Sequence, residues 1–148
     1  MTLDRSRYLI AAVAATAALG LAPAVAHAAP PAPEAPEASE AGAAADGYFY
    51  VWEHEKKRGR QASWRGNSAD WSDRNMRNRA SSAHNRGYAG AYEDVRMYWG
   101  KGYTGASYCL PNGGYLLHMT RDFFPRNGTG GGQTLNDNVS SHRWGDYC

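Results

Sequence analysis

Apolar and polar residues alternate along two stretches of the chain, residues 48–52 and 95–99. A period of two is typical of a strand with one buried face. Turn-forming residues interrupt the rest every several positions, and no stretch carries a sustained apolar stripe at helical spacing. The pattern therefore predicts an all-β domain. The residues predicted to face inward are Phe49, Val51, Val95, Met97 and Trp99.

This β pattern occurs twice, because residues 50–64 resemble residues 96–110 at an offset of 46. In each copy a glycine, Gly59 or Gly105, follows an aromatic residue by seven positions. A hairpin folded back on its own sheet needs a residue that is free to take a positive φ. We therefore expect two Greek-key sheets packed as a sandwich.

A second repeat relates residues 77–82 to residues 136–141, now at an offset of 59. The second copy is thereby thirteen residues longer, and the glycine-rich stretch 127–132 is a natural place for much of that gain.

The two repeats together resemble the βγ-crystallin Greek-key pattern. In that pattern an aromatic residue is followed by Gly and Ser/Thr, and later by Asn/Asp-Asn/Asp-x-x-Ser/Thr-Ser. The first copy is looser, with Gln61 at the Ser/Thr position and Arg77 at the first Asn/Asp position. The resemblance covers essentially all of 47–148 and implies a βγ-crystallin-like sandwich of two Greek-key motifs, about 47–92 and 93–148. The matching residues of the second copy are Tyr98, Gly105, Ser107, Asn136, Asp137, Ser140 and Ser141.

The first 28 residues have the features of an export signal. Two arginines precede an apolar run at 8–21, and residues 26–28 form the small-x-small cleavage pattern Ala-His-Ala. We expect residues 1–28 to be removed and the protein to be secreted to the extracellular space. No other stretch approaches the length of a membrane span.

Residues 29–46 are rich in Pro, Ala and Glu and carry four acidic and no basic residues. A segment of this composition has too little to bury, so we expect an extended or disordered tail. A pro-segment is the alternative. The remaining residues, 47–148, are enough for one small domain.

The domain is mildly basic, with fourteen Lys and Arg against nine Asp and Glu in 47–148. This spread-out balance does not predict nucleic-acid binding, and we expect a monomer with no membrane partner. The one dense basic stretch, 56–60, is expected to be a solvated hairpin tip.

The chain has two cysteines, Cys109 and Cys148. In an oxidising compartment two cysteines are expected to pair. The bridge would enclose 38 residues and would stabilise the domain by about 4 kcal/mol on the chain-entropy estimate.

More narrowly, the chain resembles the actinobacterial secreted metalloproteinase inhibitors that use this fold. The shared features are secretion, a single two-motif domain, the strand openings at 50–55 and 94–100, and the closing stretch 135–144. In those inhibitors the reactive bond joins a disulfide-linked Cys to a following apolar residue. The resemblance implies an extracellular metalloproteinase as partner, Cys109–Leu110 as the reactive bond and Cys148 as its tether. The Leu110 side chain is then expected to fill an apolar pocket of the enzyme.

Two departures leave another interpretation open. Pro111 lacks the N–H that an extended substrate offers to an enzyme, and the family's additional short-loop disulfide has no counterpart here. The alternative is that the disulfide only stabilises the fold and that Leu110 belongs to the core.

The βγ-crystallin resemblance also implies a calcium site, since that family binds calcium through this loop. The oxygen donors would be Asp137, Asn138 and Ser140. Calcium takes six to eight oxygen ligands, so one short loop supplies only some of them. The alternative is an Asx/Ser turn that holds the corner of the sheet. No cofactor is required, and calcium is the one candidate.

Catalysis is not expected. The stretch at 54–58 begins like the zinc-protease signature HExxH but ends in Arg, and no G-x-S-x-G motif occurs. Inhibition of thermolysin-like metalloproteinases, which the resemblance implies, is therefore the first function hypothesis. The alternatives are a calcium-binding βγ-crystallin structural module and a small antifungal toxin-like protein of the same fold.

Overall fold

The computed structural model describes residues 44–148. The predicted signal, 1–28, and most of the predicted tail, 29–46, lie outside this range. Within the described residues no helix is both long and apolar enough to cross a membrane.

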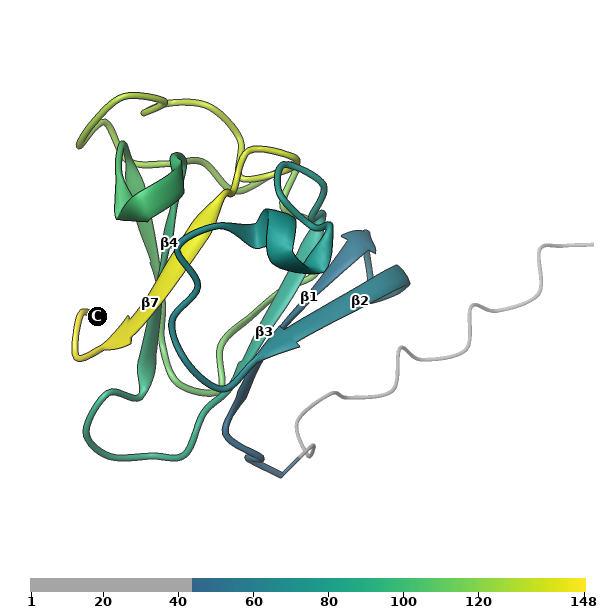
Figure 1. Cartoon of the computed structure of the whole chain (residues 1–148), viewed down its shortest axis with the longest axis vertical. Helices are drawn as coiled ribbons and strands as arrows, with labels where there is room; N and C mark the ends of the chain where they lie inside the picture. Colours follow the sequence, from purple (N-terminus) through teal and green to yellow (C-terminus); the bar gives the residue numbers. More distant parts are fainter. Residues whose placement is uncertain (1–43) are drawn as a thin grey trace, which may run out of the picture. The chain divides into compact units, whose positions relative to one another are not determined.

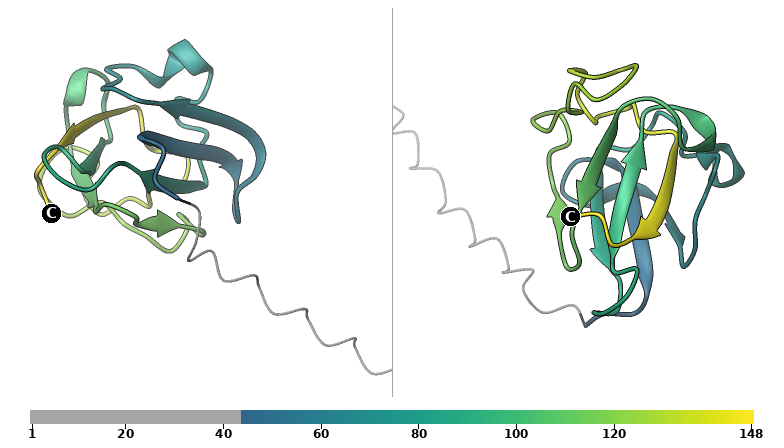
Figure 2. Two further views of the ribbon diagram at one scale, coloured as in Figure 1. Left: turned by 90° about the horizontal axis from the view of Figure 1, so that it is seen from below. Right: turned by 90° about the vertical axis from the view of Figure 1, so that its left-hand side faces the viewer.

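Within residues 44–148, seven strands form two antiparallel sheets that face each other (Figures 1 and 2). The order of the first sheet is β2-β1-β3-β6, and that of the second is β5-β4-β7. The helical elements of residues 44–148 are two short 3-10 turns, η1 at Trp71–Arg74 and η2 at Lys101–Tyr103. The all-β prediction is confirmed. The strands are β1 Tyr48–His54, β2 Arg58–Trp64, β3 Ser82–Arg86, β4 Asp94–Tyr98, β5 Ser107–Leu110, β6 Tyr115–Leu116 and β7 Ser141–Gly145.

The core lies between the two sheets and is filled by the predicted alternation. Phe49 and Val51 of β1 and Val95 and Met97 of β4 are fully buried. Trp99, just beyond β4, is partly buried against the same core. Side chains in a strand alternate between faces, so one register fixes this whole inward set.

Each motif lends a short segment to the sheet of the other. The two-residue strand β6 of the second motif pairs with β3 in the first sheet. In return, Ser68 of the first motif forms an isolated bridge with His142 of β7. Neither sheet is complete without the other motif, so the domain is expected to fold as one unit.

The two repeat glycines have the predicted backbone. Gly59 has φ +78° and Gly105 has φ +79°, in the region that favours glycine. A Cβ on Gly59 would lie 2.7 Å from the His54 ring, and a Cβ on Gly105 would lie 2.7 Å from the Thr129 carbonyl oxygen. Both positions combine a positive φ with close packing, which explains why each copy keeps its glycine.

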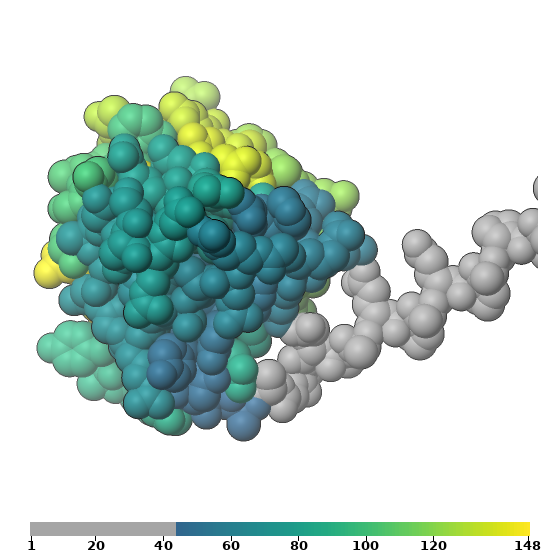
Figure 3. Space-filling view, turned by 45° about the vertical axis from the view of Figure 1, so that its right-hand side comes forward, coloured from purple at the N-terminus to yellow at the C-terminus, as the bar shows by residue number. Residues whose placement is uncertain are grey.

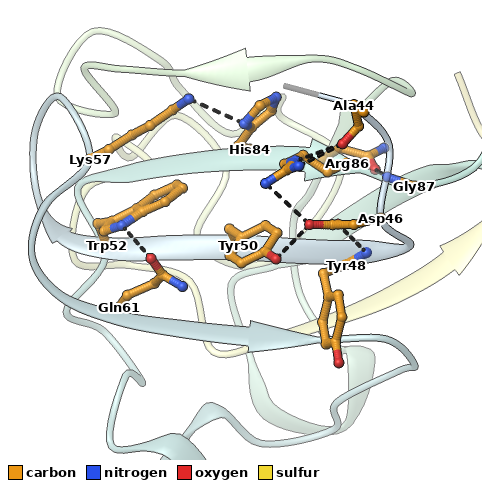
Figure 4. A network of polar contacts seen from close by, with 11 residues as sticks. Ala44, Asp46, Tyr48, Tyr50, Trp52, Lys57, Gln61, His84, Arg86 and Gly87 are labelled. Carbon is orange, nitrogen blue, oxygen red and sulfur yellow. Dashed lines mark hydrogen bonds and ion pairs between the residues drawn. The ribbon is translucent and has the colours of Figure 1, made fainter. Parts of the chain in front are cut away.

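The hairpin tip between β1 and β2 is exposed at residues 56 and 58–60, as expected, and differs from the expectation at one residue. Lys57 is half-buried rather than solvated, with its Nζ 3.2 Å from His84 Nδ1 and 5.6 Å from the Trp52 ring centroid (Figure 4). Trp52 therefore keeps only 9% of its surface exposed, although it points to the outer face of the sheet. The sequence pattern gave no sign of this cover, because the turn and the sheet are close only in three dimensions.

A polar network on the same outer face fastens the start of the described chain to the sheet (Figure 4). Arg86 Nη1 pairs with Asp46 at 3.1 Å, and Arg86 Nη2 donates to the Ala44 carbonyl at 2.6 Å. The Tyr50 hydroxyl donates to Asp46 at 2.7 Å. The domain boundary near residue 47 thus has a few additional ordered residues before it.

Candidate functional site

The two cysteines meet at the open edge of the second sheet. Cys109 lies in β5, an edge strand, and is disulfide-bonded to Cys148 with a Cα–Cα distance of 5.8 Å. The predicted pairing of these cysteines is present. The bridge ties the C-terminal residue to the middle of the sheet edge.

A buried carboxylate holds the same C-terminal segment a second time. Asp94 Oδ2 accepts hydrogen bonds from the backbone N–H groups of Cys148 at 2.7 Å and Tyr147 at 2.9 Å. Its other oxygen accepts from Asn112 N–H at 3.3 Å. These backbone donors, the Cys148 N–H first, lower the pKa of Asp94 below its ordinary value. The ionised carboxylate therefore clasps both the C-terminus and the loop that follows β5.

The side chain of Leu110 points into the core. It keeps 3% of its surface exposed and belongs to the same buried cluster as Val95, its partner in β4. The expectation that Leu110 is presented to an enzyme pocket is wrong for this conformation. The physical reason is the two-residue period of β5, which places Cys109 outward and Leu110 inward.

The backbone of β5 is better placed for contact than the Leu110 side chain. Ser107 bonds through both N–H and carbonyl to the Asn127 side chain, at 3.0 and 3.1 Å, so these groups point away from β4. Antiparallel pairing repeats every two residues, so the Cys109 carbonyl points toward the same edge, which the Asn127 side chain covers at Ser107. Among residues 44–148 no side-chain donor or further backbone donor bonds to this carbonyl.

A buried amide fixes the end of β5 to the neighbouring sheet. Asn85 of β3 is fully buried, and its Nδ2 donates to the carbonyls of Leu110 at 3.2 Å and Glu93 at 2.8 Å. Its Oδ1 accepts from Gly87 N–H at 2.9 Å. Sequence reasoning missed Asn85, because a polar residue in a strand pattern reads as solvent-facing.

The predicted calcium ligands lie where the two motifs meet, since the Asp137 N–H donates to the Ala80 carbonyl of the first motif at 3.0 Å. Figure 3 shows the yellow C-terminal part beside the blue and teal first motif. Asp137 lines a small cavity together with Glu53 and Arg79, which form an ion pair. Burial raises the pKa of Asp137. Ser140 Oγ donates to Asn78 Oδ1 at 2.8 Å.

Asn138 is engaged away from that cavity. Its Nδ2 donates to the carbonyls of Thr134 and Asn136, both at 3.0 Å. The guanidinium of Arg79 places a positive charge where a cation would need carboxylates free, so the Asp137 surroundings fit a divalent ion poorly. Calcium binding by Asp137, Asn138 and Ser140 stays a prediction.

Comparison with known proteins supplies the class of activity. The family model for peptidase inhibitor family I36 matches residues 37–110. The chain belongs to this family. The match ends at Leu110 and so includes all of β5. Membership of an inhibitor family confirms the expectation of a non-enzymatic protein with a peptidase as its partner. No curated protein matches the sequence of this family member.

Solved structures of similar shape establish the fold. A βγ-crystallin domain from work on the evolution of the eye-lens fold has a TM-score of 0.53 and 19% identity, over 72% of this chain and 93% of that one. A βγ-crystallin from Ciona intestinalis has a TM-score of 0.49 and 16% identity, over 66% and 99%. A βγ-crystallin from an archaeon has a TM-score of 0.49 and 18% identity, over 66% of this chain and 95% of that one. The I36 chain therefore has the βγ-crystallin fold.

Proposed function

We propose that this I36 protein inhibits extracellular zinc metalloproteinases of the thermolysin type by presenting the edge of β5 at the Cys109–Leu110 peptide bond. The observation that carries the proposal is that the predicted reactive bond lies in an edge strand and is tethered by the Cys109–Cys148 disulfide. Secretion is part of the proposal and rests on the predicted signal, residues 1–28.

An edge strand has backbone groups that a second extended chain can pair with. A zinc peptidase polarises the carbonyl of the bond it attacks. The Cys109 carbonyl, directed at the open edge, is the group that the zinc would approach. Insertion of the Leu110 side chain into an enzyme pocket is not part of the proposal, because that side chain is in the core.

The tether explains how such a segment could inhibit rather than be consumed. A cut between Cys109 and Leu110 would leave the first fragment ending at Cys109 and the second ending at Cys148, still joined by the disulfide. Pairing with β4 and the Asn85 bond to Leu110 would keep both new ends in place. A rigid segment also loses little conformational entropy on binding.

The experiment is a titration of the full chain against thermolysin, with subtilisin as the comparison enzyme of another class. We expect stoichiometric inhibition of thermolysin and none of subtilisin. After long incubation, mass spectrometry of the unreduced chain should show the addition of one water, and reduction should release fragments that end at Cys109 and begin at Leu110. Absence of inhibition, or a stable complex with cleavage only elsewhere, would contradict the proposal.

Calcium binding is a separate proposal, which the Arg79–Glu53 ion pair opposes and one unpartnered buried oxygen next to Asp137 favours. The Oδ1 atom of Asn136 is buried without a hydrogen-bond partner among the described residues. Calorimetry with calcium on the native chain and on Arg79→Ala, which removes the competing guanidinium, tests it. Heat of binding that Asp137→Ala abolishes would support the site, and no heat from either chain would reject it.

A further inference from the structure

A groove of about 470 Å³ opens at the end of the sandwich where β7 ends. Its walls come from residue 47 before β1, residues 65–67 after β2, the loop between β3 and β4, and residues 143–147. Figure 1 shows the start of β1, the loop between β3 and β4 and the end of β7 at the same end of the molecule. The calcium loop and the Leu110 side chain do not line it. The aromatic and basic residues that line it are Arg65, Tyr88, Tyr92, Arg143, Trp144 and Tyr147.

We call this groove the tyrosine groove. Three of its aromatic rings pack directly against glycines. A Cβ added to Gly47 would lie 2.7 Å from the Tyr88 ring, and one added to Gly87 would lie 2.6 Å from the Trp144 ring. A Cβ added to Gly145 would lie 2.3 Å from the Tyr147 ring. Contacts this short exclude any side chain at these glycines unless the rings move.

The groove exposes large side chains that a core would normally bury. Tyr88 is 64% exposed and Tyr92 is 68% exposed. Tyr92 also has φ +61°, a left-handed conformation that is rare for a bulky residue. Its N–H donates to Asp146 Oδ1 at 2.6 Å, which fixes the loop to the C-terminal segment. Strain of this kind persists where surrounding contacts over-determine it, and it clusters at functional sites.

The groove is basic. Arg65 and Arg143 line it, and no acidic residue does. Each guanidinium stacks on a tyrosine outside the groove, Arg65 on Tyr48 at 4.5 Å and Arg143 on Tyr103 at 4.8 Å. Neither has an ion pair with a carboxylate of residues 44–148. The indole Nε1 of Trp144 is buried and has no acceptor in the same range.

The tyrosine groove is connected to the β5 edge through the C-terminal clasp. Tyr147, one wall of the groove, directly precedes the disulfide-bonded Cys148. The guanidinium of Arg96 stacks on the Tyr147 ring at 4.4 Å, and Arg96 is the register partner of Cys109 in β5. An enzyme seated on the edge of β5 would therefore lie close to the groove.

We propose that the tyrosine groove is a second contact for the inhibited peptidase and receives an acidic surface segment of that enzyme. The inference rests on the proposed function and adds to it a partner surface of stated charge. Tyr, Trp and Arg are the residues enriched at binding hot spots. The two arginines without ion pairs supply the charge complementarity, and the exposed rings of Tyr88 and Tyr92 supply the contact area.

The test measures inhibition of thermolysin by full-length variants. Tyr88→Ala and Tyr92→Ala are each expected to raise the inhibition constant about tenfold or more, as removal of a hot-spot aromatic does. Phe123→Ala is the matched control, because Phe123 is 55% exposed and does not line the groove. It should leave the constant within twofold.

Charge is tested by Arg143→Glu against Arg77→Glu, which changes the net charge equally at an exposed residue outside the groove. Only Arg143→Glu should slow association and flatten its dependence on salt, since steering is local and screened. In the complex, the amide-region NMR signal of the Trp144 indole N–H should shift. Thermal melts of all variants separate a folding defect from a binding defect.

The outcomes separate the two proposals. If the native chain inhibits thermolysin and the groove variants, folded, inhibit it within twofold of native, the groove inference is overturned and the proposed function stands. If the native chain inhibits no metalloproteinase, the proposed function fails and the groove inference falls with it. Equal losses in the groove variants and in the two controls would also overturn the groove inference, because the effect would not be local.

Discussion

At the scale of single residues, contact distances decide which positions tolerate a side chain. Gly87 and Gly66 both lie near the tyrosine groove, and neither has a positive φ. A Cβ on Gly87 would lie 2.6 Å from the Trp144 ring, whereas a Cβ on Gly66 would meet nothing within 4 Å. The two glycines therefore have different reasons to be present, although the sequence shows them alike.

Gly87→Ala is expected to lower the free energy of unfolding by about 1–3 kcal/mol, the usual cost of overpacking. Gly66→Ala is the control and should be within about 0.5 kcal/mol of native. Urea denaturation followed by tryptophan fluorescence measures both. Equal stabilities of the two variants would contradict the packing of Trp144 on Gly87.

Leu110 is a core residue, so its substitution should change the stability of the domain. Because its side chain is 3% exposed among core residues, Leu110→Ala should destabilise the domain by about 2–5 kcal/mol. Leu110→Met keeps the volume and should cost less than about 1.5 kcal/mol. Denaturation midpoints of the two variants check this. A nearly neutral Leu110→Ala would mean that the side chain leaves the core in solution.

At the scale of elements, β5 is held by more than its pairing with β4. The disulfide, the Asp94 clasp and the amides of Asn85 and Asn127 all fix this one four-residue strand or its ends. A short edge strand has few backbone hydrogen bonds of its own, so these additional links keep it in place.

Replacing both cysteines, Cys109→Ser with Cys148→Ser, should lower the free energy of unfolding by about 4 kcal/mol, because the unfolded chain regains the entropy of the opened loop. Guanidinium denaturation measures the loss. Asp94→Asn with the disulfide intact is the comparison and should cost less, since a neutral amide oxygen still accepts from the backbone N–H of Cys148. A loss below about 1 kcal/mol in the double variant would show that β5 does not need the tether.

At the scale of the whole molecule, His142 joins the two motifs. It is fully buried in β7, accepts from Trp71 Nε1 at 2.8 Å through Nδ1, and lies 3.0 Å from the Gly66 carbonyl through Nε2. The ring centroid of Phe49, from the other sheet, is 4.8 Å away. These partners define a neutral imidazole with its proton on Nε2.

Burial lowers the pKa of His142 to about 3, from an ordinary value of 6.5. Between these values the unfolded chain binds the proton and the folded chain does not, so acidification favours unfolding. Stability should be complete above pH 6.5 and fall toward pH 3 by up to about 1.4 kcal/mol per pH unit for this group.

Denaturation at several pH values tests the slope, and His142→Gln should reduce it. Some slope should remain in the variant, because burial also lowers the pKa of His84, to about 4. An unchanged slope in His142→Gln would show that His142 is not the group that titrates.

Much of the fold could be predicted from the sequence because alternation and repeated glycines are local signals. The inward sets of β1 and β4 and the positive φ of Gly59 and Gly105 all follow from neighbours a few positions away. Since the chain has two cysteines, one disulfide pairing is possible within the molecule. By contrast, β6 has two residues, and its pairing with β3 comes from the other motif, so no local pattern identifies it.

The candidate site divides in the same way. The sequence by itself determined the class of fold and the disulfide partners, since both depend on composition or on local spacing. Only the tertiary structure decided that β5 is an edge, that Leu110 faces the core and that three aromatic rings lie on glycines to form the tyrosine groove. These features depend on which distant segments pack together, and that packing is a property of the whole chain rather than of any stretch of it.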